Sequence, residues 1–248
     1  MSSHRGFFVT GTDTEVGKTL VAAALTIGLR RHGNDVAVIK PIATGAIRKG
    51  NRLIAEDTAF LQRATEGRQT ISEVTPSSYT FEIPASPHFA AQLADRQIER
   101  NLLFDFFQLV NLKYPVVIVE AIGGILVPIS DDWMVADMAQ AFALPLVIVA
   151  RSGLGTLNHT LLTLEAARRR GLTVAGVVFS QTSAPACEHQ SPWTLIEQDN
   201  ISTIKRLGSV EILGAIPYIS DLPDFDPIEA YRKTETYIDW GKVLKWIQ

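Results

Sequence analysis

The chain has 248 residues, of which 46% are hydrophobic and 20% are charged, and its formal net charge is −3. This near-neutral balance excludes a protein that coats DNA or RNA through excess Lys and Arg, so we expect no nucleic-acid partner. No apolar run reaches the ~18 residues that cross a bilayer, so we expect no membrane partner. The start of the chain has no signal-peptide core, and the single cysteine, Cys187, excludes an internal disulfide framework and a Cys-rich zinc site. We therefore expect a cytoplasmic protein.

Short apolar runs rich in Val and Ile alternate along the chain with longer helical stretches. Strands are predicted at residues 7–10, 36–39, 116–119, 146–149, 174–179 and 212–216. Helices are predicted at 18–31, 57–65, 102–112 and 156–170, and another begins at Ser86-Pro87. The strands are apolar on both faces, as in parallel strands that helices cover on each side. The sequence therefore predicts the α/β class, with a mostly parallel open sheet flanked by helices in three layers.

No repeat, low-complexity tract or linker divides the chain. We therefore expect one domain over residues 1–248. Residues 183–192 are rich in Ser, Pro and Ala and are predicted to form a surface loop. Cys187 lies in this stretch, and we assign it no role.

A phosphate-binding loop is predicted between the first strand and the first helix, in the stretch Gly11-Thr12-Asp13-Thr14-Glu15-Val16-Gly17-Lys18-Thr19. A standard P-loop has Gly, four residues and then Gly-Lys-Ser/Thr; here Gly11 lies one residue early and Thr12 takes the first glycine's place. Backbone N–H groups and a helix N-terminus present partial positive charge to phosphate oxygens. Gly17 allows close approach, Lys18 reaches the β and γ phosphates, and Thr19 coordinates Mg²⁺. The motif predicts a P-loop NTPase-like domain; the alternative is a glycine-rich turn with a solvated lysine.

Three further charged residues are candidates for the site, and two of them, Lys40 and Glu120, follow predicted strands, whose carboxyl ends are where ligands bind in an open α/β sheet. Glu120 ends the strand 116–119 and Asp57 stands near a helix start, and both are candidate ligands for Mg²⁺, which prefers oxygen donors. The residues alone leave a solvated strand end for Glu120 and a helix N-cap for Asp57 as alternatives. Lys40 follows the second strand. Its positive charge is expected to stabilise negative charge on a transferring phosphoryl group or on an anionic nucleophile. Its alternative is a solubilising charge.

With these features in hand, the sequence resembles the dethiobiotin synthetase family of P-loop ATPases, whose phosphate loop has the same early glycine. The resemblance rests on the stretch 11–19 and on four further segments in the family's order: Lys40–Gly45 (KPIATG), Pro84–His88 (PASPH), Gly153–Thr160 (GLGTLNHT) and Gly214–Tyr218 (GAIPY). It implies an ATP- and Mg²⁺-dependent ligase of biotin biosynthesis. The implied reaction is carboxylation and ring closure of 7,8-diaminopelargonic acid with CO₂ to dethiobiotin.

The resemblance also implies roles for particular residues. Lys40 and Lys18 are the implied catalytic residues, and Thr19, Asp57 and Glu120 the implied metal ligands. Implied contacts to ATP are Glu15, Val16, Gly17, Lys18, Thr19, Leu20, Asp57, Glu120, Ala121, Ile122, Gly123, Ser180, Gln181, Pro217, Tyr218 and Ile219. Implied contacts to the small-molecule substrate are Thr12, Thr44, Gly153, Leu154, Gly155, Thr156 and Asn158. In the family's homodimer the segment that Gly153–Asn158 resembles serves the other subunit, so we expect a homodimer with composite active sites.

Two departures from the family pattern leave other interpretations open. The family usually has Glu-Gly-Ala-Gly-Gly after the third strand, whereas here Ala121 and Ile122 add bulk beside the nucleotide. This motivates the interpretation of a family member that binds nucleotide without catalysing a reaction.

The second departure concerns the base. The family tends to have an Asn that faces adenine, and here Ser180, followed by Gln181, stands at that position. A second alternative is a nucleotide-switch ATPase of the partitioning type, but those proteins typically carry a Lys early in the loop, which Thr12-Asp13-Thr14 lacks.

Overall fold

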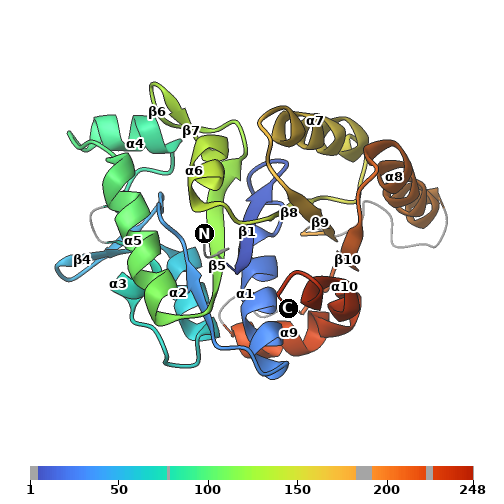
Figure 1. Ribbon diagram of the computed structural model, residues 1–248, viewed down its shortest axis with the longest axis horizontal. Coiled ribbons are helices and arrows are strands. Elements are labelled where there is room, and N and C mark those ends of the chain that lie inside the picture. Colours follow the sequence, from blue (N-terminus) through green and yellow to red (C-terminus); the bar gives the residue numbers. More distant parts are fainter. Residues whose placement is uncertain (1–4, 77–78, 183–191, 222–225, 248) are drawn as a thin grey trace.

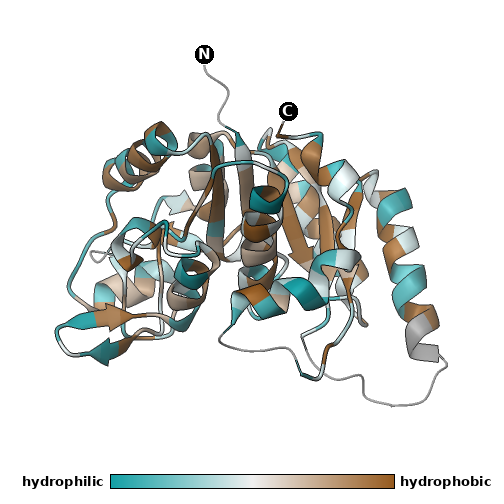
Figure 2. Cartoon of the chain, turned by 90° about the horizontal axis from the view of Figure 1, so that it is seen from below, coloured by the Kyte–Doolittle hydropathy of each residue, from teal (hydrophilic) through white to brown (hydrophobic). Residues whose placement is uncertain are grey.

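The computed structural model describes residues 5–76, 79–182, 192–221 and 226–247. In this part of the chain six strands form one parallel sheet in the order β10-β9-β8-β1-β5-β2 (Figure 1). They are β1 (Gly6–Gly11), β2 (Val36–Ile39), β5 (Val116–Gly124), β8 (Leu146–Ala150), β9 (Val174–Ser180) and β10 (Ile212–Ile216). Figure 2 shows the hydrophobic colour gathered in these central strands.

Successive strand residues point to opposite sides of the sheet, and here both sides are apolar. Helices therefore cover both faces of the sheet. Phe7 and Phe8 are neighbours on β1 and are both fully buried, yet they belong to different hydrophobic clusters. The Phe7 cluster includes side chains of α1 (Lys18–Arg31), α2 (Glu56–Ala64), α3 (Ile71–Val74), α9 (Pro227–Thr234) and α10 (Trp240–Leu244). The Phe8 cluster includes side chains of α4 (Pro87–Leu93), α5 (Arg100–Lys113), α6 (Val135–Phe142), α7 (Thr156–Arg169) and α8 (Pro192–Gly208). The predicted three-layer α/β fold is confirmed.

Three small elements stand outside these layers, and the sequence patterns did not predict them. Two antiparallel hairpins pair β3 (Ile47–Lys49) with β4 (Arg52–Ile54), and β6 (Pro128–Ser130) with β7 (Trp133–Met134). A short 3₁₀ helix, η2, spans Glu235–Tyr237. Strands of two or three residues are too short to show a period-2 pattern. No described helix is both long and apolar enough to cross a bilayer.

Several predicted boundaries need correction. The third predicted strand continues to Gly124, so Glu120 lies inside β5 and not at its end. The N-cap of α2 is Ala55, so the N-cap alternative for Asp57 is wrong. Residues 183–191 of the predicted loop, with Cys187, lie outside the described residues, and Pro192 already begins α8.

Strand order and register gather the charged residues at one edge of the sheet. From β5 the chain crosses β1 to reach β8, which makes the carboxyl end of β1 a switch point where ligands bind in such folds. Ile39 on β2 pairs with Val119 on β5, so the next residue along each strand brings Lys40 beside Glu120. Glu120 in turn pairs with Val9 of β1, just before the phosphate loop.

Candidate active site

The loop between β1 and α1 forms a compact turn at this edge. Two of its residues adopt the left-handed conformation, Glu15 at φ 55° and Gly17 at φ 91°. A Cβ on Gly17 would lie 2.5 Å from the Ser180 hydroxyl oxygen, so this position requires glycine for space as well as for conformation. Lys18 begins α1, and its Nζ donates to the carbonyl oxygen of Asp13 at 2.7 Å. The lysine ammonium and the unpaired N–H groups of the first helical turn thus share one region, an arrangement suited to phosphate.

Lys18 carries a costly charge in this position. The pKa of its ammonium falls to about 8, mainly because of burial; the carboxylates of Glu120 and Asp13 oppose this in part, and the neighbouring ammonium of Lys40 adds to it. An anionic ligand against Nζ favours the protonated form and raises the pKa again. The site is therefore electrostatically poised for an anion.

A second cluster joins three buried or half-buried charges. Lys40 Nζ lies 2.5 Å from Asp57 Oδ2 and 2.7 Å from Glu120 Oε1. Burial by itself lowers the pKa of Lys40, but the two carboxylates raise it by more, so the net pKa stands above its ordinary value and the ammonium stays charged at neutral pH. Lys40 is 4% exposed and Glu120 is 1% exposed. A solubilising charge at Lys40 and a solvated strand end at Glu120 are both wrong.

The oxygen atoms of this cluster fit a magnesium ion. Thr19 Oγ1 donates to Glu120 Oε1 at 2.9 Å, and Thr19, Asp57 and Glu120 line one cavity. The other carboxylate oxygen, Glu120 Oε2, is buried and has no hydrogen-bond partner within the described chain. A buried anionic oxygen without a partner is costly, and a divalent cation would satisfy it. No group of three or more His, Cys, Asp or Glu occurs in the described segments, so water and phosphate oxygens would complete the coordination.

A cavity of about 450 Å³ unites the phosphate loop with the Lys40 cluster. Its described lining consists of Thr14, Glu15, Gly17, Lys18, Thr19, Lys40, Thr44, Asp57, Glu120, Ile122, Gly123 and Thr182. Ten of these twelve are candidate site residues of the sequence analysis, the exceptions being Thr14 and Thr182. Three other candidates, Val16, Leu20 and Ala121, instead pack their side chains in or against the hydrophobic clusters. Thr12 lies at the start of the loop, where its N–H donates to the Val149 carbonyl at 2.9 Å.

The remaining candidates lie outside that lining. Ser180 is 1% exposed, faces Gly17, and has a hydroxyl without a hydrogen-bond partner in the described chain. The Gln181 N–H donates to the carbonyl of Ile216, which brings Pro217, Tyr218 and Ile219 to the same sheet edge after β10. The segment Gly153–Asn158 follows β8 and enters α7, and its Leu154 is 82% exposed. None of these six residues belongs to the described lining of the phosphate-loop cavity.

Thr182 is a residue that the sequence reasoning missed. It lines the cavity, and its hydroxyl donates to the carbonyl oxygen of Glu15 at 2.9 Å. One signal was present in the sequence, since Thr182 stands three residues after the predicted strand 174–179, at the edge where ligands bind.

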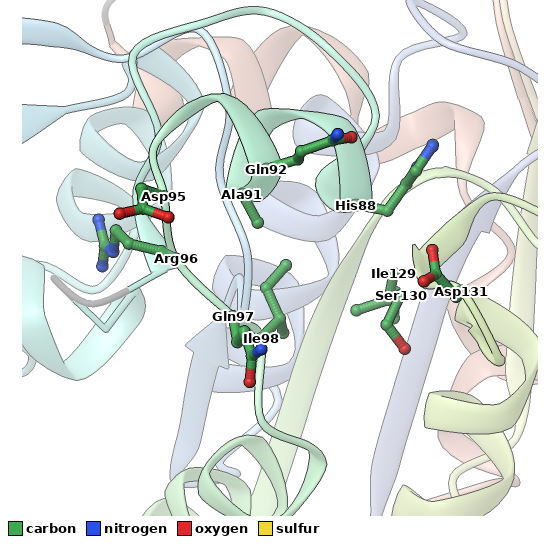
Figure 3. A pocket seen from close by; sticks show the side chains of 10 residues that line it. All are labelled: His88, Ala91, Gln92, Asp95, Arg96, Gln97, Ile98, Ile129, Ser130 and Asp131. Atoms are coloured by element: carbon green, nitrogen blue, oxygen red, sulfur yellow. The ribbon is translucent and has the colours of Figure 1, made fainter.

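A second cavity, of about 700 Å³, lies between α4 and the β6–β7 hairpin (Figure 3). Ala91, Ile98 and Ile129 are its apolar lining, while side chains such as His88 and Asp131 are polar. It shares no lining residue with the phosphate-loop cavity. Its lining carries both charge signs and no glycine-rich turn, so it lacks the features of a phosphate site.

The fold and the turn at Gly17-Lys18-Thr19 define a P-loop nucleotide-binding protein, and a family model described as an AAA domain matches residues 5–224. The chain is 36% identical over 244 residues to the ATP-dependent dethiobiotin synthetase BioD of Bacillus licheniformis, covering 98% of this chain and 97% of the relative. It is 34% identical to the BioD of Halalkalibacterium halodurans, covering 96% and 94%. The chain belongs to the ATP-dependent dethiobiotin synthetase family, as its motifs predicted.

Solved structures with a similar fold come from another group of P-loop proteins. The MinC:MinD cell division protein complex of Aquifex aeolicus matches with a TM-score of 0.56 at 16% identity, covering 97% of this chain and 96% of that chain. A ParA family ATPase of Chlorobium tepidum matches with a TM-score of 0.51 at 15% identity, covering 98% and 97%. At these identities the likeness shows the fold alone.

Proposed function

We propose that this chain is an ATP-dependent ligase that makes dethiobiotin from 7,8-diaminopelargonic acid, CO₂ and ATP. The observation that carries the proposal is the convergence of two ammonium groups, Lys18 and Lys40, and two carboxylates, Asp57 and Glu120, on one cavity beside the phosphate loop. Membership of the dethiobiotin synthetase family supports the choice of reaction.

The proposed reaction has three steps. One amine of the substrate adds to CO₂ and loses a proton, giving a carbamate. A carbamate oxygen then attacks the γ-phosphorus of ATP, the bond to the bridging oxygen breaks, and ADP leaves. The second amine attacks the carbonyl carbon of the resulting carbamic–phosphoric anhydride and loses a proton, so that inorganic phosphate leaves and the cyclic urea closes.

The two lysines act on different parts of this sequence. Lys18, held against the loop by Asp13, is placed to balance charge on the phosphates as the phosphoryl group moves. Lys40 is buried and charged and lines the same cavity as Thr44, which suits an anionic carbamate and the transferring phosphoryl group. Thr19, Asp57 and Glu120 would hold Mg²⁺, which supplies Lewis-acid stabilisation of the phosphate charge when bound.

We propose that Thr12 and Thr44 contact the diamine end of the substrate and that a second copy of the chain binds the carboxylate end. Gly155 is the left-handed N-cap of α7, at φ 92°, and nothing within 4 Å blocks a Cβ there. The start of a helix presents N–H groups and partial positive charge that suit a carboxylate. Leu154, Gly155 and Asn158 are exposed, so this part of the segment is available to a neighbouring subunit in a homodimer.

The test is to incubate the pure protein with ATP, Mg²⁺, bicarbonate and diaminopelargonate, and to measure dethiobiotin and phosphate together. We expect one phosphate per dethiobiotin. We also expect ¹⁸O from freshly added labelled CO₂ in the phosphate, because the carbamate oxygen stays with phosphorus. Phosphate release that does not depend on diaminopelargonate would favour a switch-type ATPase, and ATP binding without either product would favour a non-catalysing member.

A further inference from the structure

Residues that follow β8 and β9 contact the side chain or backbone of the phosphate loop. On the β8 side, Arg151 Nη2 lies 3.2 Å from Asp13 Oδ2. On the β9 side, Thr182 Oγ1 donates to the carbonyl oxygen of Glu15 at 2.9 Å, across 167 residues of sequence. Arg151 and Thr182 follow the carboxyl ends of β8, the strand beside β1, and of β9, the strand after it on that side of the sheet.

The residue that accepts the hydrogen bond from Thr182 is Glu15, whose backbone conformation is unfavourable for a non-glycine residue. Glu15 has φ 55°, in the left-handed region that non-glycine residues keep only where their surroundings hold them there. No described peptide bond is cis, and in a trans peptide the carbonyl and the following N–H point in opposite directions. Because Thr182 holds the Glu15 carbonyl toward itself, the N–H of Val16, within the phosphate loop, points away from Thr182.

The neighbouring hydroxyl on this strand does not take part. Ser180 Oγ lies against Gly17 and has no hydrogen-bond partner in the described chain, so it fills space beneath the loop. Thr182 therefore supplies the hydroxyl bond from β9, and its methyl group also lies close to Gly17.

We propose that Thr182 is a positioning residue for the phosphate loop, whose hydroxyl keeps the Glu15–Val16 peptide in its phosphate-binding orientation before the nucleotide arrives. This inference rests on the proposed nucleotide site. A loop that is ordered before binding has less conformational freedom to lose on binding, so its affinity is higher. The gain in affinity applies to the phosphate groups of a ligand, because the Glu15–Val16 peptide lies in the phosphate loop.

The experiment compares Thr182→Val, which removes the hydroxyl at nearly constant volume, with Thr182→Ser, which retains it. Thr173→Val is the matched control, because it makes the same change at the exposed residue just before the other end of β9. Calorimetry gives the affinity of each protein for ATP and for inorganic tripolyphosphate, a probe without base or ribose. We expect Thr182→Val to bind both ligands about five- to tenfold more weakly, the factor of one net hydrogen bond. We expect Thr182→Ser and Thr173→Val to stay within about twofold of the unchanged protein.

Each other outcome overturns the inference in a recognisable way. Loss of affinity for ATP but not for tripolyphosphate means that Thr182 contacts the nucleoside. Equal losses in Thr182→Val and Thr182→Ser mean that the hydroxyl is not the cause, and unchanged affinities mean that the hydrogen bond does not order the loop. An affinity loss matched by a lower Tm means a general structural role. If the unchanged protein binds neither ligand, the proposed nucleotide site fails as well.

Discussion

Replacing Lys18 by methionine is expected to stabilise the protein while it removes nucleotide binding. Lys18 is 8% exposed, and its pKa falls from 10.5 to about 8, mainly because of burial. A shift of this size corresponds to about 3 kcal/mol of cost for the charged form in the folded state. Methionine has a similar length and no charge, but it forfeits the hydrogen bond to Asp13, worth about 1 kcal/mol. We therefore expect a net gain of about 2 kcal/mol in the free energy of unfolding, or about 4–8 °C in Tm for a chain of this size.

The pH dependence gives this prediction its sharpest test. Below pH 8 Lys18 is protonated in both the folded and the unfolded chain, so the folded protein carries the full cost. Between about pH 8 and 10.5 the folded state releases the proton that the unfolded state keeps, so stability rises with pH and the cost disappears. The advantage of Lys18→Met is thus full at pH 7 and small at pH 10.

Urea unfolding without nucleotide or metal measures this difference at both pH values. Lys205→Met, at an exposed position of α8, is the control, and it is expected to change stability by less than about 0.5 kcal/mol at either pH. A Lys18→Met protein less stable than the unchanged chain at pH 7 would refute the argument. So would an advantage that does not shrink as the pH rises, because the gain would then not come from removing a buried charge.

Three further predictions concern the proposed reaction. Lys40→Ala should lower kcat on the order of 100-fold or more while ATP affinity changes little, because Lys40 is assigned to the carbamate and the moving phosphoryl group; weaker ATP binding with normal kcat at saturation would contradict that role. Mixing inactive Lys40→Ala protein with an inactive Asn158→Ala protein should restore partial activity after subunit exchange, since some heterodimers hold one intact composite site; no recovery would mean that each chain builds its own site. ATP should be preferred over CTP and GTP by roughly tenfold or less in kcat/KM, because Ser180 is buried against Gly17 and offers no second contact to a base; a preference beyond about a hundredfold would show that other groups read adenine.

The six strands of the central sheet and the helices α1, α2, α4, α5 and α7 could be predicted because their sequence signals are local, whereas α3, α6, α8, α9 and α10 were not predicted. The strand Val36–Ile39 and the helix Lys18–Arg31 occur at the predicted residues. The strand is an unbroken apolar run, and Gly33 and Asn34, which follow the helix, are residue types that commonly end one. The hairpins β3–β4 and β6–β7 could not be predicted, because strands so short take their structure from contacts elsewhere. The single domain over 1–248, the homodimer and the cytoplasmic location stay predictions.

The sequence predicted which residues form the candidate site, but not the hydrogen bonds and ion pairs between them. Motifs and the switch-point rule brought Lys18, Lys40 and Glu120 to one sheet edge. That Lys40 bridges two carboxylates follows from the register of β2 on β5 and from the start of α2, neither of which the sequence displays. The bond from Thr182 to Glu15 was hidden for the same reason, because a hydroxyl near a strand end has no motif of its own.

The two residues that depart from the family pattern after Glu120 do not bear equally on catalysis. The sequence suggested that Ala121 and Ile122 both narrow the nucleotide site. Ala121 is fully buried and packs in the hydrophobic cluster of Phe8, so its methyl group adds to the core and takes no space from the cavity. Ile122 does line the cavity, next to Gly123. The steric argument for a member that binds nucleotide without catalysing is therefore reduced to one side chain. Because the ion pairs between Lys40 and its two carboxylates form in the presence of that side chain, its bulk bears on how tightly the nucleotide fits and not on whether the charged groups assemble.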